Sequence, residues 1–228
     1  MLTPQRELVL KWENRTQMTQ MERRFNQRKT AFHQRGGVLS EADRQRWNEK
    51  WAERTRSRRV NRLLLEHHGL LGGGRALDLA CGRGQNSIWL ARHGYTTLGV
   101  DVSGVALRAA RAAAAREGVW RYTLFVQADL DRWRPPAETF NLVAVFRFLD
   151  RDLYEPLKGC VLPGGLLFYE TRHEGILERL PDANPAYLLR RDELRQVFSG
   201  WQMIDYREGP ENAGLVARKP CALSLIHI

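Results

Sequence analysis

From Arg75 onward, short apolar runs alternate with stretches of helical periodicity, and this alternation limits the possible folds more than any other feature of the chain. Continuous apolar runs are typical of strands that are buried on both faces of a parallel sheet. The expected strands are Ala76–Ala80, Thr97–Val100, Tyr122–Val126, Leu142–Phe146 and Gly165–Tyr169. The expected helices are Gln85–His93, Ser103–Glu117, Arg151–Gly159 and Asp192–Phe198.

Two further strands are expected near the end of the chain, at Gln202–Arg207 and Leu215–Arg218, with no helix between them. Strands that are joined so directly pair in an antiparallel fashion. The fold class is therefore α/β, with a doubly wound, mostly parallel sheet of seven strands that ends in an antiparallel hairpin.

The segment before this pattern divides into two parts. Residues 1–38 are polar and rich in Gln and Arg, whereas residues 39–74 contain helical patterns that end at three consecutive glycines. Trp47 and Trp51 lie four residues apart, on one helical face. We expect a basic arm over 1–38, which is either native or an over-read upstream segment, and helices over 39–74 that cover the sheet edge or border a ligand site. The main domain is expected over 75–220.

The formal net charge of +10 is concentrated at the N-terminal side, where residues 1–60 contain 15 Lys and Arg against 7 Asp and Glu. Such a basic arm can bind nucleic-acid phosphates, or it can be a solvated helix. No run of apolar residues approaches the roughly 18 that a membrane span needs. Cys81, Cys160 and Cys221 are too few and too far apart for a disulfide scaffold, which indicates a reducing cytoplasm.

The candidate binding site follows the first expected strand. Gly82 and Gly84 lie between this strand and the next expected helix, where glycine lets the backbone turn and approach a ligand closely. Asp101 ends the second expected strand, where a carboxylate can accept both hydroxyls of a ribose. Asp129 follows the third strand and can accept a hydrogen bond from an exocyclic amine, such as that of adenine.

Each of these residues also has a structural interpretation, because the glycines could serve a turn and Asp101 could cap the helix after Ser103. Their joint occurrence at the ends of successive strands favours a nucleotide-type ligand. A dinucleotide-binding dehydrogenase is disfavoured, since the third glycine of its fingerprint would fall at Ser87. Asp78, inside the first strand, suits a pocket for a cationic amino-acid tail instead.

The segment ALDLACGRGQNSIWLARHGYTTLGVDVSGVALRAA resembles the glycine-loop and acidic-strand motifs of the class I S-adenosylmethionine-dependent methyltransferases. The resemblance covers residues 60–219. FNLVAVFRFLDRDLYEPLKGCVLPGGLLFYET is similar to the family's fourth-strand and fifth-strand motifs, and with NPAYLLRRDELRQVF it is most similar to the small tellurite-resistance-like branch. The resemblance implies a Rossmann-like methyltransferase fold and S-adenosyl-L-methionine as the cofactor.

The resemblance also implies roles for individual residues. The loop under the methionine part of the cofactor would include Asp78, Gly82 and Gly84, Asp101 would hold the ribose and Asp129 the adenine. Gly84 is expected to leave little room for a side chain, because backbone and ligand approach there. The full expected cofactor set is Asp78, Ala80, Gly82, Gly84, Asn86, Asp101, Val102, Ala128, Asp129, Leu130, Phe146 and Arg147.

Methyl transfer from a sulfonium needs alignment more than acid–base catalysis, although a proton that develops on the acceptor can require a base. Weak candidates for a catalytic role are Arg147, Tyr169, Glu170 and His173. Their alternatives are core packing for Tyr169, surface positions for Glu170 and His173, and a salt bridge of Arg147 with Asp150 or Glu170. No metal site is expected, because His67 and His68 lack companions at metal-binding spacing.

Three functions remain open at this level. The favoured one is a cytoplasmic methyltransferase for a small-molecule acceptor. An RNA methyltransferase that uses the basic arm is the second, although the strand-four end, Phe146 to Leu149, lacks the Asn/Asp-Pro-Pro-aromatic pattern of amino-methylating enzymes. A non-catalytic cofactor-binding module is the third. LSLIHI, at residues 223–228, resembles translated adapter sequence, and residues 221–228 are expected to be foreign to the domain.

Overall fold

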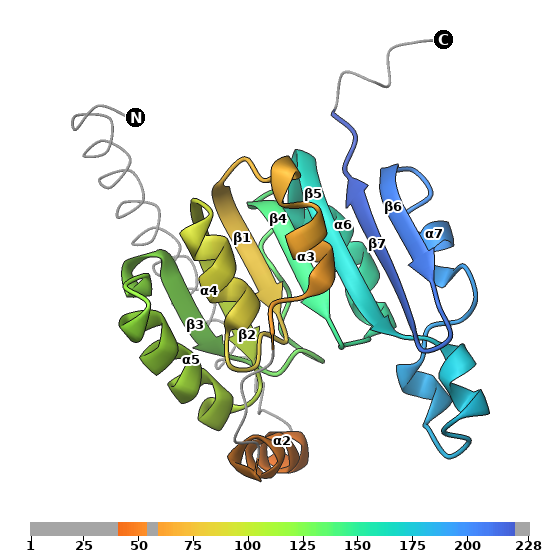
Figure 1. The fold of residues 1–228 in the computed structure, drawn as a ribbon, viewed down its shortest axis with the longest axis horizontal. Helices are drawn as coiled ribbons and strands as arrows, with labels where there is room; N and C mark the ends of the chain where they lie inside the picture. The colour runs from red at the N-terminus through yellow and green to blue at the C-terminus, as the bar shows by residue number, and fades with distance from the viewer. Residues whose placement is uncertain (1–40, 54–58, 222–228) are drawn as a thin grey trace.

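Seven strands form one sheet in the order β3-β2-β1-β4-β5-β7-β6 (Figure 1). The computed structural model describes residues 41–53 and 59–221. The strands are β1 Gly74–Leu79, β2 Tyr95–Asp101, β3 Thr123–Gln127, β4 Phe140–Phe146, β5 Val161–Arg172, β6 Gln202–Glu208 and β7 Asn212–Arg218. β1 to β5 pair in parallel and β7 runs antiparallel to both β5 and β6. The predicted doubly wound, mostly parallel sheet with a terminal antiparallel hairpin is confirmed.

The helices lie on both faces of this sheet (Figure 1). They are α2 Glu41–Glu53, α3 Arg62–Glu66, α4 Gln85–Arg92, α5 Gly104–Arg116, α6 Tyr154–Cys160 and α7 Glu193–Val197. Short 3-10 helices are η1 His68–Leu70, η2 Trp120–Tyr122, η3 Arg151–Leu153, η4 Glu174–Glu178 and η5 Pro185–Tyr187. Among the described residues, no helix has the length and apolarity that crossing a membrane requires.

The two faces of the sheet bury separate apolar clusters, because successive side chains of a strand point to opposite sides. On one face, Ala144 and Phe168 of the sheet pack with Leu64 of α3 and Leu90 of α4. On the other face, the sheet packs against α6, α7 and the residues that flank them, which contribute the second set of side chains: Leu153, Tyr154, Leu157, Leu194 and Phe198. Helix α3 is thus part of the same core as the sheet.

The chain crosses from one half of the sheet to the other between β3 and β4, through a segment that contains no helix in the structure. β1 has β2 on one side and β4 on the other, and this is where the strand order reverses. In open α/β sheets, ligands bind beyond the carboxyl ends of the strands at such a switch point. The fold therefore places the glycine loop after β1 at the expected position for a ligand.

Several predicted boundaries change in detail. The helix that was expected at Arg151–Gly159 begins with the 3-10 turn η3, and the one expected at Asp192–Phe198 is the shorter α7. Trp201 lies just before β6 and packs edge-on against Phe198, with ring centroids 5.5 Å apart. The predicted basic arm over 1–38 and nearly all of the predicted foreign tail lie outside the described residues.

The close packing around Gly84 yields a test of the fold. Gly84 has a φ of +75°, and a Cβ there would lie 2.8 Å from the Phe125 ring and 3.0 Å from the Ala110 Cβ. Gly84→Ala should lower the free energy of unfolding by about 2–5 kcal/mol, because a left-handed backbone costs about 1–2 kcal/mol and overpacking adds about 1–3 kcal/mol. Urea denaturation measures this loss.

Gly118 provides the matched control. Its φ is +71°, but nothing lies within 4 Å of its Cβ position. Gly118→Ala should therefore show the backbone cost alone, about 1–2 kcal/mol. Equal losses for the two variants would contradict the assigned contact with Phe125 and Ala110.

Candidate active site

Three buried carboxylates lie at the carboxyl edge of the sheet or just inside it. Asp78 is in β1, Asp101 ends β2 and Asp129 follows β3, and their exposed fractions are 1%, 6% and 5%. Because these strands are parallel neighbours, their carboxyl ends meet at one edge. The structure thus brings together the three acids that the sequence predicted for one site.

The loop after β1 has an unusual backbone. Ala80, Gly82 and Gly84 all have positive φ, at 54°, 55° and 75°. Ala80 carries a side chain in this left-handed region, which is uncommon for a residue other than glycine. The side-chain position of Gly84 faces Phe125 and Ala110, so packing within the protein leaves little room for a side chain there.

Asp101 connects this loop to the start of α5. Its Oδ2 accepts a hydrogen bond from the Gly82 N–H at 2.7 Å, and its Oδ1 accepts one from the Ser103 N–H at 2.8 Å. Ser103, and not Asp101, is the residue that caps α5, since its hydroxyl accepts from the Ala106 N–H at 3.2 Å. Burial raises the pKa of Asp101, and the backbone hydrogen bonds oppose this shift.

Asp78 lies beneath the loop and is bound by the first turn of α4. The Ser87 hydroxyl donates to its Oδ2 at 2.5 Å. Burial raises the pKa of Asp78 to about 7; the bonds from Ser87 lower it and the charge of Asp101 adds to the rise. A cation placed beside this carboxyl would offset its desolvation.

The remaining predicted cofactor residues surround the ends of β2 and β3. The Ala128 N–H donates to the Asp101 carbonyl at 3.0 Å, and the Val102 carbonyl accepts from Gln127 at 2.9 Å. Asp129 accepts from the Asp131 N–H at 3.1 Å. Ala128 and Leu130 are buried. The loops after β2 and β3 therefore form one hydrogen-bonded unit.

Phe146 and Arg147 end β4 on the other side of the switch point. Phe146 is buried in the cluster shared with α3 and α4, whereas Arg147 is exposed with a φ of 59°. The Arg147 N–H donates to the Glu170 carbonyl at 2.8 Å. The structure shows no ion pair of the Arg147 guanidinium with Asp150 or Glu170, which the sequence had offered as its structural role.

The three candidate bases of β5 and its end have different environments. Tyr169 is fully buried, its hydroxyl donates to the Phe148 carbonyl at 3.1 Å, and burial raises its pKa, as suits a core residue. His173 is buried and not at the surface; its Nε2 lies 3.2 Å from Glu208, and its Nδ1 accepts from the Gly175 N–H. Glu170 is half-buried near the carboxyl end of β5.

Asn61, which the sequence analysis did not single out, holds Glu170 in place. The Asn61 side chain donates to Glu170 Oε1 at 2.7 Å, and its oxygen caps α3 by accepting from the Leu63 N–H at 2.8 Å. The Asn61 N–H in turn donates to Asn86 Oδ1 at 2.9 Å. Asn86 thus binds the segment before α3. The only local signal for Asn61 is its position as a cap before an apolar helix.

Helix α2 lies on the glycine loop. Trp51 is 7% exposed, and a Cβ at Gly82 would be 2.6 Å from its indole ring. Arg83 donates to the Trp51 carbonyl at 2.9 Å. Asn48 accepts from the Ser103 hydroxyl at 2.7 Å. The contacts of α2 are therefore with the loops that carry Gly82 and Asp101.

The described residues include no group of three His, Cys, Asp or Glu side chains that could hold a metal ion. Cys81, next to the loop, is buried, and burial raises the pKa of its thiol well above the usual value. A thiol in this state is a poor nucleophile, which agrees with the interpretation of Cys81 as a small buried residue.

The raised pKa of Asp78 yields a pH test. Between pH 3.8 and about pH 7, Asp78 stays protonated in the folded protein, whereas it is ionised in the unfolded chain. The free energy of unfolding should therefore fall as pH rises through this interval and level off above it. The side chain of the Asp78→Asn variant cannot ionise. Between pH 4 and pH 8, the free energy of unfolding of wild type should therefore fall by up to about 4 kcal/mol relative to this variant.

Urea denaturation of both proteins at several pH values measures this difference. Asp101 contributes a slope of the same sign in both proteins, so the comparison isolates Asp78. Parallel pH profiles for wild type and Asp78→Asn would show that Asp78 ionises as readily in the folded protein as in the unfolded one.

Part of this chain is similar to known methyltransferases. Residues 76–165 match a family model described as a methyltransferase domain. Ribosomal RNA small subunit methyltransferase C of Alcanivorax borkumensis is 46% identical over 55 residues, which are 24% of this chain and 17% of that protein. Ubiquinone biosynthesis O-methyltransferase of Acinetobacter baylyi is 29% identical over 135 residues, 55% of this chain and 57% of that protein.

The chain spans less than two thirds of the length of these curated relatives. Among solved structures, TehB from Haemophilus influenzae matches with a TM-score of 0.61 at 16% identity, over 75% of this chain and 66% of that one. This similarity shows a shared fold, in line with the predicted tellurite-resistance-like resemblance. The matching methyltransferase domain over residues 76–165, the strand order and the buried acids around the glycine loop agree with the resemblance to the class I S-adenosylmethionine-dependent methyltransferases.

Proposed function

We propose that this protein transfers a methyl group from S-adenosyl-L-methionine to a small-molecule acceptor. The observation that carries the proposal is the set of three buried carboxylates around the glycine loop, Asp78, Asp101 and Asp129. Buried acids are costly unless a partner compensates them. A ligand with an ammonium group, ribose hydroxyls and an adenine amine offers one partner for each, so the residues present fit this cofactor.

In this proposal the methionine part lies over the loop of Ala80 and Gly82, with its ammonium near Asp78. Asp101 holds the ribose with the lone pairs that its bonds to Gly82 and Ser103 leave open. The adenine lies between the loops after β2 and β3. The residues in that part of the expected set are Val102, Ala128, Asp129 and Leu130.

The cofactor supplies an activated methyl group on a sulfonium, which leaves by in-line displacement. The protein's task is then to hold donor and acceptor in contact and aligned. Phe146 and Arg147 flank the reacting centre at the end of β4. Glu170 is the candidate for receiving the acceptor's proton, because Asn61 orients its carboxylate at the sheet edge, whereas Tyr169 and His173 are engaged within the protein.

A small acceptor is favoured over RNA by two observations. Phe146 to Leu149 lacks the pattern of amino-methylating enzymes. The match to the ribosomal RNA methyltransferase covers 17% of that protein, whereas the match to a ubiquinone biosynthesis O-methyltransferase covers 57% of it. The acidic motif residues are all retained, which disfavours a binding module without transfer activity.

One assay tests both the cofactor and the acceptor class. Tritiated S-adenosylmethionine is incubated with the full chain and either a small-metabolite extract or total RNA. We expect label in the small-molecule fraction alone. Asp101→Ala should weaken cofactor binding roughly 10- to 150-fold, because charge-assisted hydrogen bonds to the ribose contribute about 1.5–3 kcal/mol. Calorimetry measures this affinity.

Two outcomes would contradict the proposal. Label in RNA that disappears when residues 1–38 are deleted would establish the RNA enzyme instead. An Asp101→Ala affinity within threefold of wild type would move the ribose site elsewhere. Since Asp101 also binds two backbone N–H groups, thermal unfolding of the variant must show that it is folded.

The position of Trp51 gives a further prediction. We expect this indole to form one wall of the cofactor pocket, because it packs on Gly82. Trp51→Ala should therefore weaken cofactor binding roughly tenfold, through the loss of about 1.5 kcal/mol or more of apolar burial. Calorimetry again provides the measurement.

Trp47 is the matched control, since it lies one turn away on α2 and its ring contacts Lys50 and Arg46 of the same helix. Trp47→Ala should leave the cofactor affinity unchanged. If both variants bind the cofactor as wild type does, α2 is not part of the site.

A further inference from the structure

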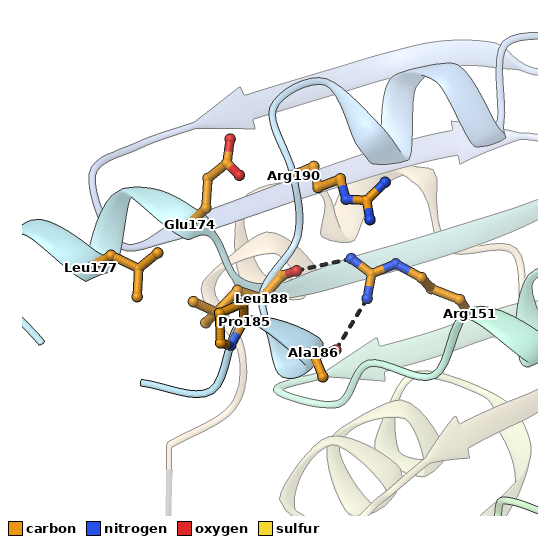
Figure 2. A pocket seen from close by; sticks show the side chains of 7 residues that line it. All are labelled: Arg151, Glu174, Leu177, Pro185, Ala186, Leu188 and Arg190. Carbon is orange, nitrogen blue, oxygen red and sulfur yellow. Dashed lines mark hydrogen bonds between the residues drawn. The ribbon is translucent and has the colours of Figure 1, made fainter. Parts of the chain in front are cut away.

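A cavity lies at the carboxyl ends of β4 and β5. It has a volume of about 230 Å³ and lies between the segments that follow β4 and β5 (Figure 2). The lining residues are Arg151, Glu174, Leu177, Pro185, Ala186, Leu188 and Arg190. β4 is the neighbour of β1, and these strands are parallel, so the cavity opens at the same edge of the sheet as the glycine loop.

The cavity wall is apolar and polar in about equal measure. Leu177, Pro185, Ala186 and Leu188 supply aliphatic surface. The same segment also carries Tyr187, which is 57% exposed, next to the cavity residues. Pockets that combine apolar surface with a few polar groups are typical of small-molecule sites. The volume is below the range of about 300–1,000 Å³ for drug-sized ligands, which indicates a ligand with roughly one ring.

Arg151 lines the cavity, and its guanidinium is hydrogen-bonded within the protein. Its guanidinium makes two hydrogen bonds of 2.8 Å to the Glu193 carboxylate. It also donates to the carbonyls of Ala186 at 3.0 Å and Leu188 at 2.9 Å, as the dashed lines in Figure 2 show. These bonds fix the irregular segment 185–190 against η3, and the charge of Arg151 is balanced by Glu193.

Arg190 differs from Arg151. Its backbone N–H donates to Glu193 at 2.9 Å, which fixes its position, but its guanidinium has no hydrogen bond or ion pair with any residue in 41–53 or 59–221. Glu174, on the same wall, accepts from the Arg191 N–H at 3.1 Å. In Figure 2 its carboxylate points away from Leu177 and Pro185. The cavity therefore offers one available cation beside aliphatic side chains.

We propose that this cavity binds the methyl acceptor and that the acceptor is a small carboxylic acid with an apolar body, whose carboxylate pairs with Arg190. The inference rests on the proposed function, because it assigns the acceptor part of that site. A guanidinium binds carboxylate and phosphate alike. A single negative charge is favoured here, since the nearby carboxylates of Glu174 and Glu193 repel a dianion.

The test uses three probes of the same size class: benzoate, its neutral isostere benzamide, and phenyl phosphate. Each is titrated into the ¹⁵N-labelled full chain, and amide shifts give the affinity. We expect benzoate to bind roughly tenfold more tightly than benzamide, as a charge-assisted hydrogen bond predicts, and more tightly than phenyl phosphate. Arg190→Gln should remove the preference for benzoate over benzamide.

Two further variants control the result. Arg191→Gln removes the same charge at the adjacent residue, whose side chain is paired with Glu208 at 3.8 Å and does not line the cavity, so the benzoate preference should persist. Leu177→Trp fills the cavity and should abolish the binding of all three probes. Thermal unfolding confirms that each variant is folded.

The proposal is overturned if benzoate fails to bind wild type, if it binds no better than benzamide, or if Arg190→Gln leaves the preference intact. Tighter binding of phenyl phosphate would replace the carboxylic acid by a phosphate ester and overturn the acceptor class. Calorimetry of S-adenosylmethionine with wild type separates the two levels: a failure there rejects the proposed function, whereas cofactor binding without benzoate selectivity rejects this inference alone.

Discussion

The carboxylate of Asp101 joins two loops that the chain makes separately. One oxygen accepts from Gly82, after β1, and the other accepts from Ser103, at the start of α5. The Asp101 carbonyl extends the connection to the loop after β3 through Ala128. Without these bonds the three loops would be independent segments at the ends of three strands. With them, the carboxyl edge of β1, β2 and β3 is one hydrogen-bonded surface.

The burial of carboxylates at this surface has an energetic cost. Burial raises the pKa of both Asp78 and Asp101, which means that their ionised forms destabilise the fold relative to exposed carboxylates. The neutral hydroxyl of Ser87 compensates Asp78 only in part. In the proposed function, a cationic, hydroxyl-rich ligand would remove much of this penalty, so binding would stabilise the fold.

The sequence predicted the strands and the glycine loop well because both are local patterns. A run of apolar residues indicates a strand that is buried on both faces of the sheet. The acids of the candidate site lie at or near the ends of such runs. The spacing of the last two strands in the sequence did not predict which of them pairs with β5. β7 takes the inner position because residues 213–217 are all buried, whereas β6 is half-exposed at the edge. Contacts between distant segments, such as Asn61 with Glu170 and Trp51 with Gly82, leave no periodic signal.

The two halves of the carboxyl edge are built differently, and this has a consequence for specificity. At the ends of β1 to β3, the edge consists of backbone N–H groups, residues with positive φ and buried acids. Almost any substitution there disturbs several hydrogen bonds. Beyond the ends of β4 and β5, the edge is formed by an irregular segment. The hydrogen-bonded pair of Arg151 and Glu193 fixes this segment. Side chains such as Leu177 and Arg190 can change there while the Asp101 network stays intact. In the proposed function, the same cofactor-binding half could then serve different acceptors.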